Sequence, residues 1–175
     1  MAHRAQIKFF QSVKQQYPRF FDSKKVLEIG SYNVNGTVRT FFNNCQYTGI
    51  DLAPGKDVDI VSSGHLFKPE DGKPFDVVIS TECFEHNEYW LETLKNMVSL
   101  CNPEGIVIIT CASRHRKEHG TKRKSPSNSL SSVFSDYYKN LSIKDFVTAF
   151  DFDSVFWKYS FTIRGNDLYF YGIKP

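Results

Sequence analysis

Five short apolar runs, separated by polar segments, set the pattern of the first two thirds of the chain. They occupy residues 26–29, 47–50, 58–61, 75–79 and 106–110. Their length and their β-branched residues are typical of strands buried on both faces, as in a parallel sheet. We therefore expect five such strands, with any ligand-binding loops after their carboxyl ends.

Apolar residues with helical spacing lie before and between these runs. The set before the first run ends near Gln16 or Tyr17, ahead of Pro18, and consists of Ile7, Phe10, Val13 and Tyr17. The set between the first two runs is Val38, Phe41 and Phe42. The set between the last two runs is followed by the helix stop Asn102-Pro103 and consists of Leu91, Leu94, Val98 and Cys101. This alternation predicts a doubly wound α/β sheet with helices on both faces.

The last third of the chain does not continue the alternation of apolar runs and helical segments. Residues 113–141 form a long polar stretch, which in a compact domain is usually functional or disordered. Ser142 and Asp145 make a capping box that opens a helix. Two aromatic runs, at 155–161 and 168–173, flank a turn at 164–167 and predict an antiparallel pair at one sheet edge. We expect one domain over residues 1–175, with a mostly parallel sheet.

Composition bears on the cellular location of the protein. Hydrophobic residues make up 41% of the chain, and no apolar stretch approaches the ~20 residues of a membrane helix. Residues 1–10 lack the apolar core of a secretory signal. The four cysteines form no CxxC pair and have no zinc-ligand spacing, so we expect free thiols and no metal. These features predict a soluble cytoplasmic protein without a membrane partner, and they leave its oligomeric state open.

Positive charge is concentrated in the long polar stretch. Residues 114–124 carry six Lys or Arg against one acid, an excess larger than the net charge of +3 of the whole chain. Because this segment follows the fifth strand, we expect residues 113–141 to form a substrate loop or lid that attracts an anionic acceptor. The candidate substrate-binding residues are Arg114, His115, Arg116, His119, Arg123, Tyr137 and Tyr138. A solvated basic face, with tyrosines that pack the loop down, is the alternative interpretation.

The strongest local motif is a strand followed by a glycine-punctuated loop at residues 26–36. Glycines at 30 and 36 allow a ligand to approach the backbone, and a following helix start would attract an anionic group. Asp51 ends the second strand, twenty-one residues beyond Gly30, where a carboxylate can accept hydrogen bonds from both ribose hydroxyls. Either glycine alone could mark an ordinary turn, and Asp51 alone could be a surface cap. Together they indicate a nucleoside site.

These segments resemble the class I S-adenosylmethionine-dependent methyltransferases, in particular small single-domain enzymes of the methyltransferase type 11 kind. The acidic strand end and glycine turn are matched by residues 28–36, and Gly49-Ile50-Asp51-Leu52 matches the second strand end. Residues 75–86 resemble the family's fourth strand and "E-x-x-E-H" element, and Pro103-Glu104-Gly105 resembles its "P-G-G" turn. Tyr32 and Val34 stand where later glycines of the family would fall.

The resemblance implies a Rossmann-like fold and S-adenosylmethionine as cofactor, with S-adenosylhomocysteine as product. The implied cofactor-binding residues, from the methionine end through ribose and adenine to the methyl group, are Glu28, Gly30, Ser31, Asn35, Gly36, Asp51, Leu52, Ser63, Gly64, His65, Thr81 and Glu82. His86 would also flank the methyl group. Ser63 stands where the family often has an acid near the adenine amine.

Methyl transfer from a sulfonium needs mainly a near-attack geometry and a dry site. If the acceptor is a hydroxyl or an amine, a general base must take its proton, and His86 or His119 is the candidate. His86 could instead cap the helix that follows it. The small size of the chain favours a small-molecule or glycan-unit acceptor, anionic or sugar-like, methylated on oxygen or nitrogen.

Three other functions stay open at this stage. A nucleotide-dependent oxidoreductase would need glycines at positions 32 and 35, which are Tyr32 and Asn35. An RNA or DNA methyltransferase could use the basic run, but residues 80–83 lack the "[DNS]-P-P-[YF]" motif of enzymes that methylate base amines, and the charge is confined to one loop. We therefore do not expect a nucleic-acid partner. A non-catalytic binding module of the same fold is the third alternative.

Overall fold

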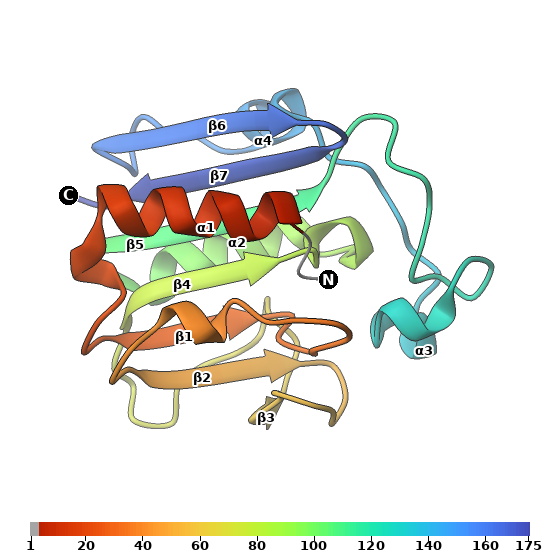
Figure 1. The fold of residues 1–175 in the computed structure, drawn as a ribbon, viewed down its shortest axis with the longest axis horizontal. Helices are drawn as coiled ribbons and strands as arrows, with labels where there is room; N and C mark the ends of the chain where they lie inside the picture. Colours follow the sequence, from red (N-terminus) through yellow and green to blue (C-terminus); the bar gives the residue numbers. More distant parts are fainter. Residues whose placement is uncertain (1–3) are drawn as a thin grey trace.

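The computed structural model describes residues 4–175, which form a seven-stranded sheet with helices packed on both faces (Figure 1). In chain order the helices, 3-10 turns (η) and strands are α1 (Arg4–Gln16), η1 (Pro18–Phe20), β1 (Lys25–Ile29), η2 (Arg39–Phe41), β2 (Gln46–Asp51), β3 (Ile60–Val61), β4 (Phe75–Thr81), η3 (Phe84–His86), α2 (Trp90–Leu100), β5 (Cys101–Ala112), η4 (Pro126–Asn128), α3 (Ser131–Phe134), α4 (Ile143–Ala149), β6 (Lys158–Arg164) and β7 (Asp167–Ile173).

The strand order is β3-β2-β1-β4-β5-β7-β6. The first five strands in this order pair in parallel, whereas β7 runs antiparallel to both β5 and β6. The order reverses between β1 and β4, and all five parallel strands end at the same edge of the sheet (Figure 1). The predicted doubly wound sheet with an antiparallel C-terminal strand is confirmed, and its reversal point is where such folds bind ligands.

Two hydrophobic cores lie on opposite faces of the sheet because successive strand residues point to opposite sides. On one face α1 packs through Phe9, Phe10 and Val13 (Figure 1). On the other face α2 and α4 pack through Leu94, Met97 and Phe146, among others. The capping box predicted at the start of α4 is present, with both of its reciprocal hydrogen bonds. The helices thus fix the sheet and leave its carboxyl edge for ligand-binding loops.

The helix predicted around Val38 and Phe41 is wrong. Only the 3-10 turn η2 forms there. The Asn33 side chain accepts a hydrogen bond from the Gly36 amide (2.8 Å), which closes a local turn in place of a helical one, and Asn44 has a left-handed φ of 51°. The short connection between β1 and β2 therefore contains no helix whose N-terminus could hold an anion after Gly30.

The third predicted strand is shorter and more exposed than its pattern indicated. β3 has two residues instead of four, and Ile60 and Val61 are both exposed. β3 lies at the edge of the sheet, and no helix connects it to β4 to cover it. Alternation of strands and helices in the sequence cannot reveal which strand becomes an edge.

The long polar stretch is a loop that crosses the carboxyl edge of the sheet. Residues 113–141 leave β5, pass beside the ends of β1 and β2, and return to α4 (Figure 1). The loop contains two short elements, η4 and α3, that the sequence did not predict.

The C-terminal hairpin forms as predicted, although its first strand begins at Lys158 and not at Val155.

The four cysteines are free thiols, of which Cys101 and Cys111 are buried. Within residues 4–175, every helix is too short or too polar to cross a bilayer.

Candidate functional site

A cavity of about 320 Å³ opens at the carboxyl ends of β1, β2 and β4, beside the reversal of strand order. This volume is at the small end of the range for ligand pockets. Of the predicted cofactor-binding residues, eight line it: Gly30, Asp51, Leu52, Ser63, Gly64, His65, Thr81 and Glu82. His86 lines it as well. The structure thus brings together residues from four separate segments.

The turn after β1 requires glycine at its first position. Gly30 has a φ of 81°, and a Cβ atom there would come within 2.5 Å of the Cys83 Cβ. The amides of Gly30 and Ser31 both donate to the Ile50 carbonyl, at 2.9 and 3.1 Å. This turn is therefore tied to β2 on one side and packed against the segment after β4 on the other. The chain then enters the cavity wall with Tyr32 and Val34.

Asp51 is held in place by backbone amides. One carboxylate oxygen accepts a hydrogen bond from the Tyr32 amide (3.0 Å), and the other accepts from the Leu52 amide (2.8 Å). Burial raises the pKa of Asp51, and these two amide donors partly offset that effect. Each carboxylate oxygen can accept a further hydrogen bond. A fixed carboxylate of this kind can accept hydrogen bonds from a pair of neighbouring hydroxyls in the cavity.

A flat aromatic surface lies on another wall of the cavity. His65 and Tyr89 stack with ring centroids 4.4 Å apart and an interplanar angle of 25°. Gly64 sits directly on the end of β1, because a Cβ atom there would come within 2.5 Å of Ile29 Cγ2. The Gly64 carbonyl accepts a hydrogen bond from the Asn96 side chain (2.8 Å). The stacked pair offers a surface on which a planar ring could lie.

Four predicted cofactor residues do not line the cavity. Asn35 and Gly36 are exposed, and Ser31 is buried beside Gly49. Glu28 is buried, with its oxygens accepting from the Tyr47 hydroxyl (2.8 Å) and the Thr81 hydroxyl (3.3 Å).

Burial of Glu28 raises its pKa to about 7, although both hydroxyl donors act in the opposite direction. Glu28 therefore influences the site through Thr81, which does line the cavity.

Glu82 connects the cavity to α1. Its backbone has a left-handed φ of 50°, and its amide donates to the Thr110 carbonyl (2.8 Å). One Glu82 carboxylate oxygen accepts from the Thr110 hydroxyl (3.0 Å), which in turn accepts from the Gln6 side chain (3.1 Å). This relay orients the Glu82 carboxylate at the end of β4.

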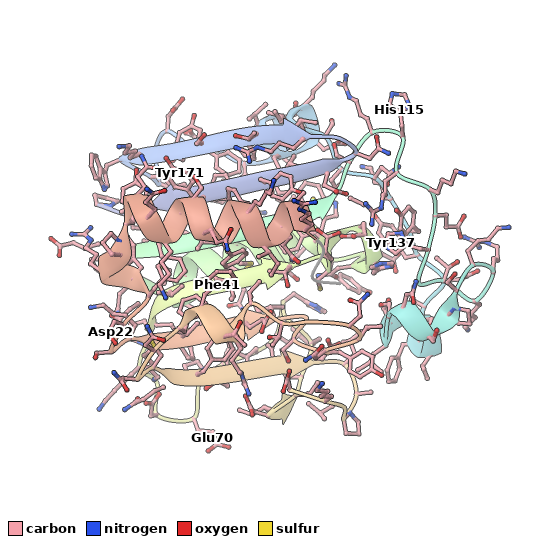
Figure 2. The ribbon with its side chains drawn as sticks, in the orientation of Figure 1. Asp22, Phe41, Glu70, His115, Tyr137 and Tyr171 are labelled. Atoms are coloured by element: carbon pink, nitrogen blue, oxygen red, sulfur yellow. The ribbon has the colours of Figure 1, made fainter. Side chains whose placement is uncertain are left out.

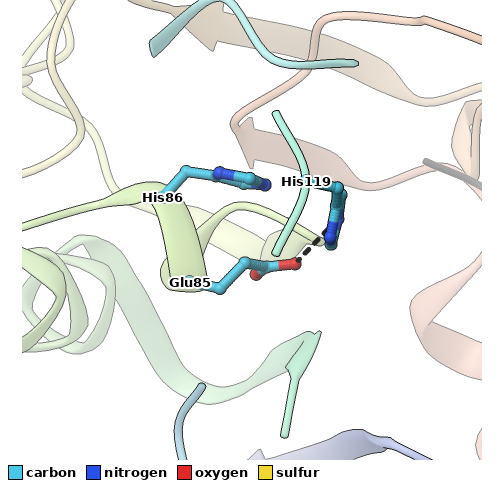
Figure 3. A group of neighbouring side chains, drawn as sticks. All are labelled: Glu85, His86 and His119. Atoms are coloured by element: carbon cyan, nitrogen blue, oxygen red, sulfur yellow. Dashed lines mark ion pairs between the residues drawn. The ribbon is translucent and has the colours of Figure 1, made fainter. Parts of the chain in front are cut away.

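The two predicted catalytic histidines meet beside the cavity. The His86 and His119 rings are perpendicular, with centroids 5.1 Å apart, and both contact the Tyr138 ring. Glu85, from the same 3-10 turn as His86, points toward His119 (Figure 3). Burial lowers the pKa of His86 to about 3 and raises that of Glu85 to about 8, the latter with a further contribution from the charge of Glu82. His86 lines the cavity, whereas His119 does not.

The predicted basic substrate residues are not on the cavity wall. Arg116 pairs with Asp167 (3.1 Å), and Arg123 pairs with Glu118 (2.8 Å) and Asp136. Arg114 is exposed, and His115 projects outward from the loop (Figure 2).

The two predicted tyrosines of the loop also lie off the cavity wall. Tyr137 is only partly exposed and occupies the returning part of the loop (Figure 2). Tyr138 packs on the two histidines. Arg116, Arg123 and Tyr138 therefore contact other residues of the chain and not the cavity.

The second part of the loop covers the cavity and was missed from the sequence. The lining residues there are Asn128, Ser129, Leu130, Ser131 and Phe134. Leu130 also lies close to Gly55, beyond β2. The signal that could have found this segment is the pair of apolar residues at helical spacing, Leu130 and Phe134, within an otherwise polar stretch. Cys83, Asn87, Glu88 and Tyr89, after β4, were missed too.

A family model described as "Methyltransferase domain" matches residues 1–162 of the chain. A search of curated protein sequences found no match to the chain.

Many solved structures share the fold at low sequence identity. The N-methyltransferase NodS from Bradyrhizobium japonicum WM9 aligns with a TM-score of 0.56 and 14% identity, over 96% of this chain and 97% of NodS. The 1,6-didemethyltoxoflavin-N1-methyltransferase from Burkholderia thailandensis aligns with a TM-score of 0.63 and 12% identity, over 95% of this chain and 78% of that enzyme. The plantazolicin methyltransferase BpumL gives a TM-score of 0.65 and 16% identity, over 96% and 82%.

Proposed function

This chain belongs to the methyltransferase domain family, within the class I S-adenosylmethionine-dependent methyltransferases, and from that membership we propose that it methylates a small polar molecule. The family match confirms the resemblance found in residues 28–36, 49–52 and 75–86. Two structural neighbours were solved with a small molecule beside S-adenosylhomocysteine: 1,6-didemethyltoxoflavin in one and a monoazolic desmethylPZN analog in the other.

The observation that carries this function is the position of Asp51 in the cavity. Its carboxylate is fixed by two backbone amides and faces the space between the ends of β1 and β2. In the proposed complex, Asp51 accepts hydrogen bonds from the two ribose hydroxyls of the cofactor. The adenine ring then reaches the wall formed by Ser63, Gly64 and His65, where the stacked pair of His65 and Tyr89 offers a planar surface.

The methionine end of the cofactor then lies near Gly30 and Thr81. Gly30 packs closely against Cys83 and lines the cavity, so the ligand meets backbone at this point. Behind this wall, the positive charge of the sulfonium and the amino group would lower the raised pKa of Glu28 and favour its carboxylate form. Asn35 and Gly36 are exposed, so their proposed contact with the cofactor requires the 31–38 loop to close over it.

The acceptor enters beside Glu82 and His86, under the segment 128–134. In methyl transfer an acceptor lone pair forms the new bond to carbon while the carbon–sulfur bond breaks and its electron pair stays on sulfur. The acceptor proton passes to the carboxylate of Glu82, which lines the cavity beside the acceptor. Residues 128–134 act as a lid that excludes water from this step, because they lie across the cavity and carry Leu130 and Phe134.

The polarity of the cavity favours a neutral, hydroxyl-rich or amine acceptor over an anionic one. Among residues 4–175, those that line the cavity include three carboxylates, on Asp51, Glu82 and Glu88, but neither Lys nor Arg. Arg116 and Arg123 are already paired with carboxylates of the chain. A sugar-like acceptor fits this wall better than a phosphate or carboxylate.

His86 is better suited to holding the acceptor than to removing its proton. A general base works best when its pKa lies near the working pH, and burial lowers the pKa of His86 to about 3. The ring therefore stays neutral where it lines the cavity. His119 and Tyr138 position it by edge-on ring contacts.

Calorimetric titration with S-adenosylhomocysteine tests the cofactor site directly. We expect micromolar binding to the wild-type chain and at least about 100-fold weaker binding to Asp51→Ala, because two hydrogen bonds to a charged acceptor contribute about 1.5–3 kcal/mol each. Asp71→Ala is the matched control, since Asp71 is half exposed and pairs with Lys25 outside the cavity. If the folded wild-type chain fails to bind, or Asp51→Ala binds equally well, the assignment of the site is wrong.

The acceptor class is tested with S-adenosylmethionine carrying a labelled methyl group. Neutral sugars and amino sugars are compared with their phosphorylated and carboxylated counterparts, and we expect label in the neutral set. Label confined to anionic acceptors, and lost in Arg116→Ala, would restore the basic loop as the substrate-binding surface.

A further inference from the structure

Three potential metal ligands converge from two separate segments of the chain. Glu85 and His86 come from η3, and His119 comes from the 113–141 loop (Figure 3). One ligand atom from each of the three side chains lies within 4.8 Å of the other two. A nitrogen–oxygen site with bonds of about 2.1 Å separates its ligands by roughly 3.4 Å in tetrahedral geometry. Small side-chain rotations would close the difference.

The hydrogen bond of His119 orients its second nitrogen toward Glu85. Nδ1 lies 3.0 Å from the Lys117 carbonyl oxygen, which can only accept, and 3.3 Å from the Tyr138 hydroxyl, which can donate or accept. With the proton on Nδ1, Nε2 has a free lone pair, and it lies 4.0 Å from Glu85 Oε1. Two potential ligand atoms thus face each other. A backbone carbonyl behind Nδ1 is the outer-shell partner typical of metal-binding histidines.

Glu85 is a fully buried carboxyl group without a well-formed hydrogen bond. It is 0% exposed, and the backbone amides of Glu85 and Ala112 approach it only in poor geometry. The buried Nδ1 of His86 has no hydrogen-bond partner among the described residues. Burial favours the protonated form of Glu85, and a divalent cation that displaced this proton would compensate for the buried charge more fully than a single hydrogen bond.

We propose that Glu85, His86 and His119 form a binding site for a first-row divalent transition-metal ion of the zinc or cobalt type. Two imidazoles and one carboxylate favour such ions over Mg²⁺ and Ca²⁺, which prefer oxygen ligands throughout. The neighbouring carboxylate of Glu82 adds negative charge on the same side of the cavity. The sequence indicated no metal site, because the spacing from His86 to His119 matches no short ligand motif.

The position of the site indicates what its ion would contact. His86 lines the cavity, whereas Glu85 and His119 do not, so an ion held by all three would lie at the cavity wall with one tetrahedral position left for another ligand. An open coordination position is the mark of sites that bind a substrate atom. On the proposed methyltransferase function, that position would hold an acceptor oxygen near the transferable methyl group.

Metal titration of the full chain, dialysed against a chelator and without cofactor, tests the site. We expect one equivalent of Co²⁺ to give visible d–d absorption bands, and Zn²⁺ to displace it. His119→Ala should bind at least about tenfold more weakly. His115→Ala is the matched control, because His115 belongs to the same loop but is exposed and projects outward. Equal affinity in His119→Ala and wild type, or no stoichiometric binding, would overturn the assignment.

Glu85→Gln provides a readout that does not depend on activity. It keeps the shape of the side chain and removes the buried charge, so the metal-free variant should melt no lower than the wild type. Zn²⁺ should raise the melting temperature of the wild type and not that of Glu85→Gln. A lowered melting temperature without metal, together with an intact zinc response, would contradict the site. Metal binding with no affinity for S-adenosylhomocysteine would instead count against the proposed function alone.

Discussion

The two sides of the cavity hold their carboxylates in different ways. On the side of β1 and β2, Asp51 accepts from two backbone amides and Glu28 from two hydroxyls. On the side of η3 and the long loop, Glu85 is buried without a well-formed hydrogen bond. On the first side, hydrogen-bond donors of the chain already meet both carboxyl groups without a ligand. On the second side, the buried carboxyl group of Glu85 still has room for a bound partner. The difference suggests a preformed cofactor side and an acceptor side completed by what it binds.

The largest expected effect comes from filling the turn after β1. Gly30→Ala places a Cβ atom within 2.5 Å of the Cys83 Cβ and puts alanine at a φ of 81°. We expect a loss of about 3 kcal/mol in the free energy of unfolding, from strain and overpacking together. Urea unfolding measures it. Gly72→Ala is the control, because Gly72 also has a positive φ but no atoms within 4 Å of its added Cβ. Equal losses in the two variants would show that packing against Cys83 is unimportant.

The next largest effect concerns the protonation state of Glu28, which lies behind the cavity wall. The pKa of Glu28 is raised from 4.5 to about 7, so the native state favours its protonated form. The stability that wild type gains from protonated Glu28 is fully present below pH 4.5 and is lost as the pH rises through 7. Glu28→Gln has no ionisable group at this position, so its stability does not fall in this way. Its stability relative to wild type should therefore rise by roughly 2–3 kcal/mol between pH 4.5 and pH 8.

Urea unfolding at both pH values measures this difference, with the exposed Glu70→Gln as control (Figure 2). If the difference between Glu28→Gln and wild type does not change with pH, Glu28 ionises at its ordinary pKa. The hydroxyls of Tyr47 and Thr81 would then satisfy its charge completely.

A smaller effect is expected at the lid. Leu130 and Phe134 contribute apolar surface to the cavity wall, and Phe134 is otherwise exposed. Phe134→Ala should raise the Michaelis constant for the acceptor about fivefold, through the loss of about 1 kcal/mol of contact on closure. Steady-state kinetics with a labelled methyl group measure it. Val133→Ala is the control, since Val133 is exposed and does not line the cavity. A matching change in both variants would point to a general effect on α3.

The smallest effect is expected in the basic part of the loop. Arg123 pairs with Glu118 and Asp136 at the surface, and such exposed pairs contribute little. Arg123→Ala should change the Michaelis constant for the acceptor less than twofold. A rise above tenfold would mean that this arginine leaves its partners to bind substrate, and the acceptor side would then be electropositive during turnover.

The sequence by itself determined the sheet and most of the cofactor side. Buried strands such as 26–29 and 75–79, the glycine at position 30 and the acid at position 51 were all predictable, because strand periodicity and turn chemistry are local properties. The family resemblance rests on the same segments. Local reasoning failed at Val38 and Phe41, where an asparagine turn replaced a helix, and at 58–61, where the edge position of β3 depends on the strand order.

Only the tertiary structure decided the acceptor side. The basic residues of the loop turned out to pair with acids such as Asp136 and Asp167, which are distant from them in sequence. His119 meets Glu85 across more than thirty residues, and Leu130 reaches the end of β2. Pairings between a long loop and distant strand ends depend on the path of the whole chain, which no short-range pattern of side chains encodes.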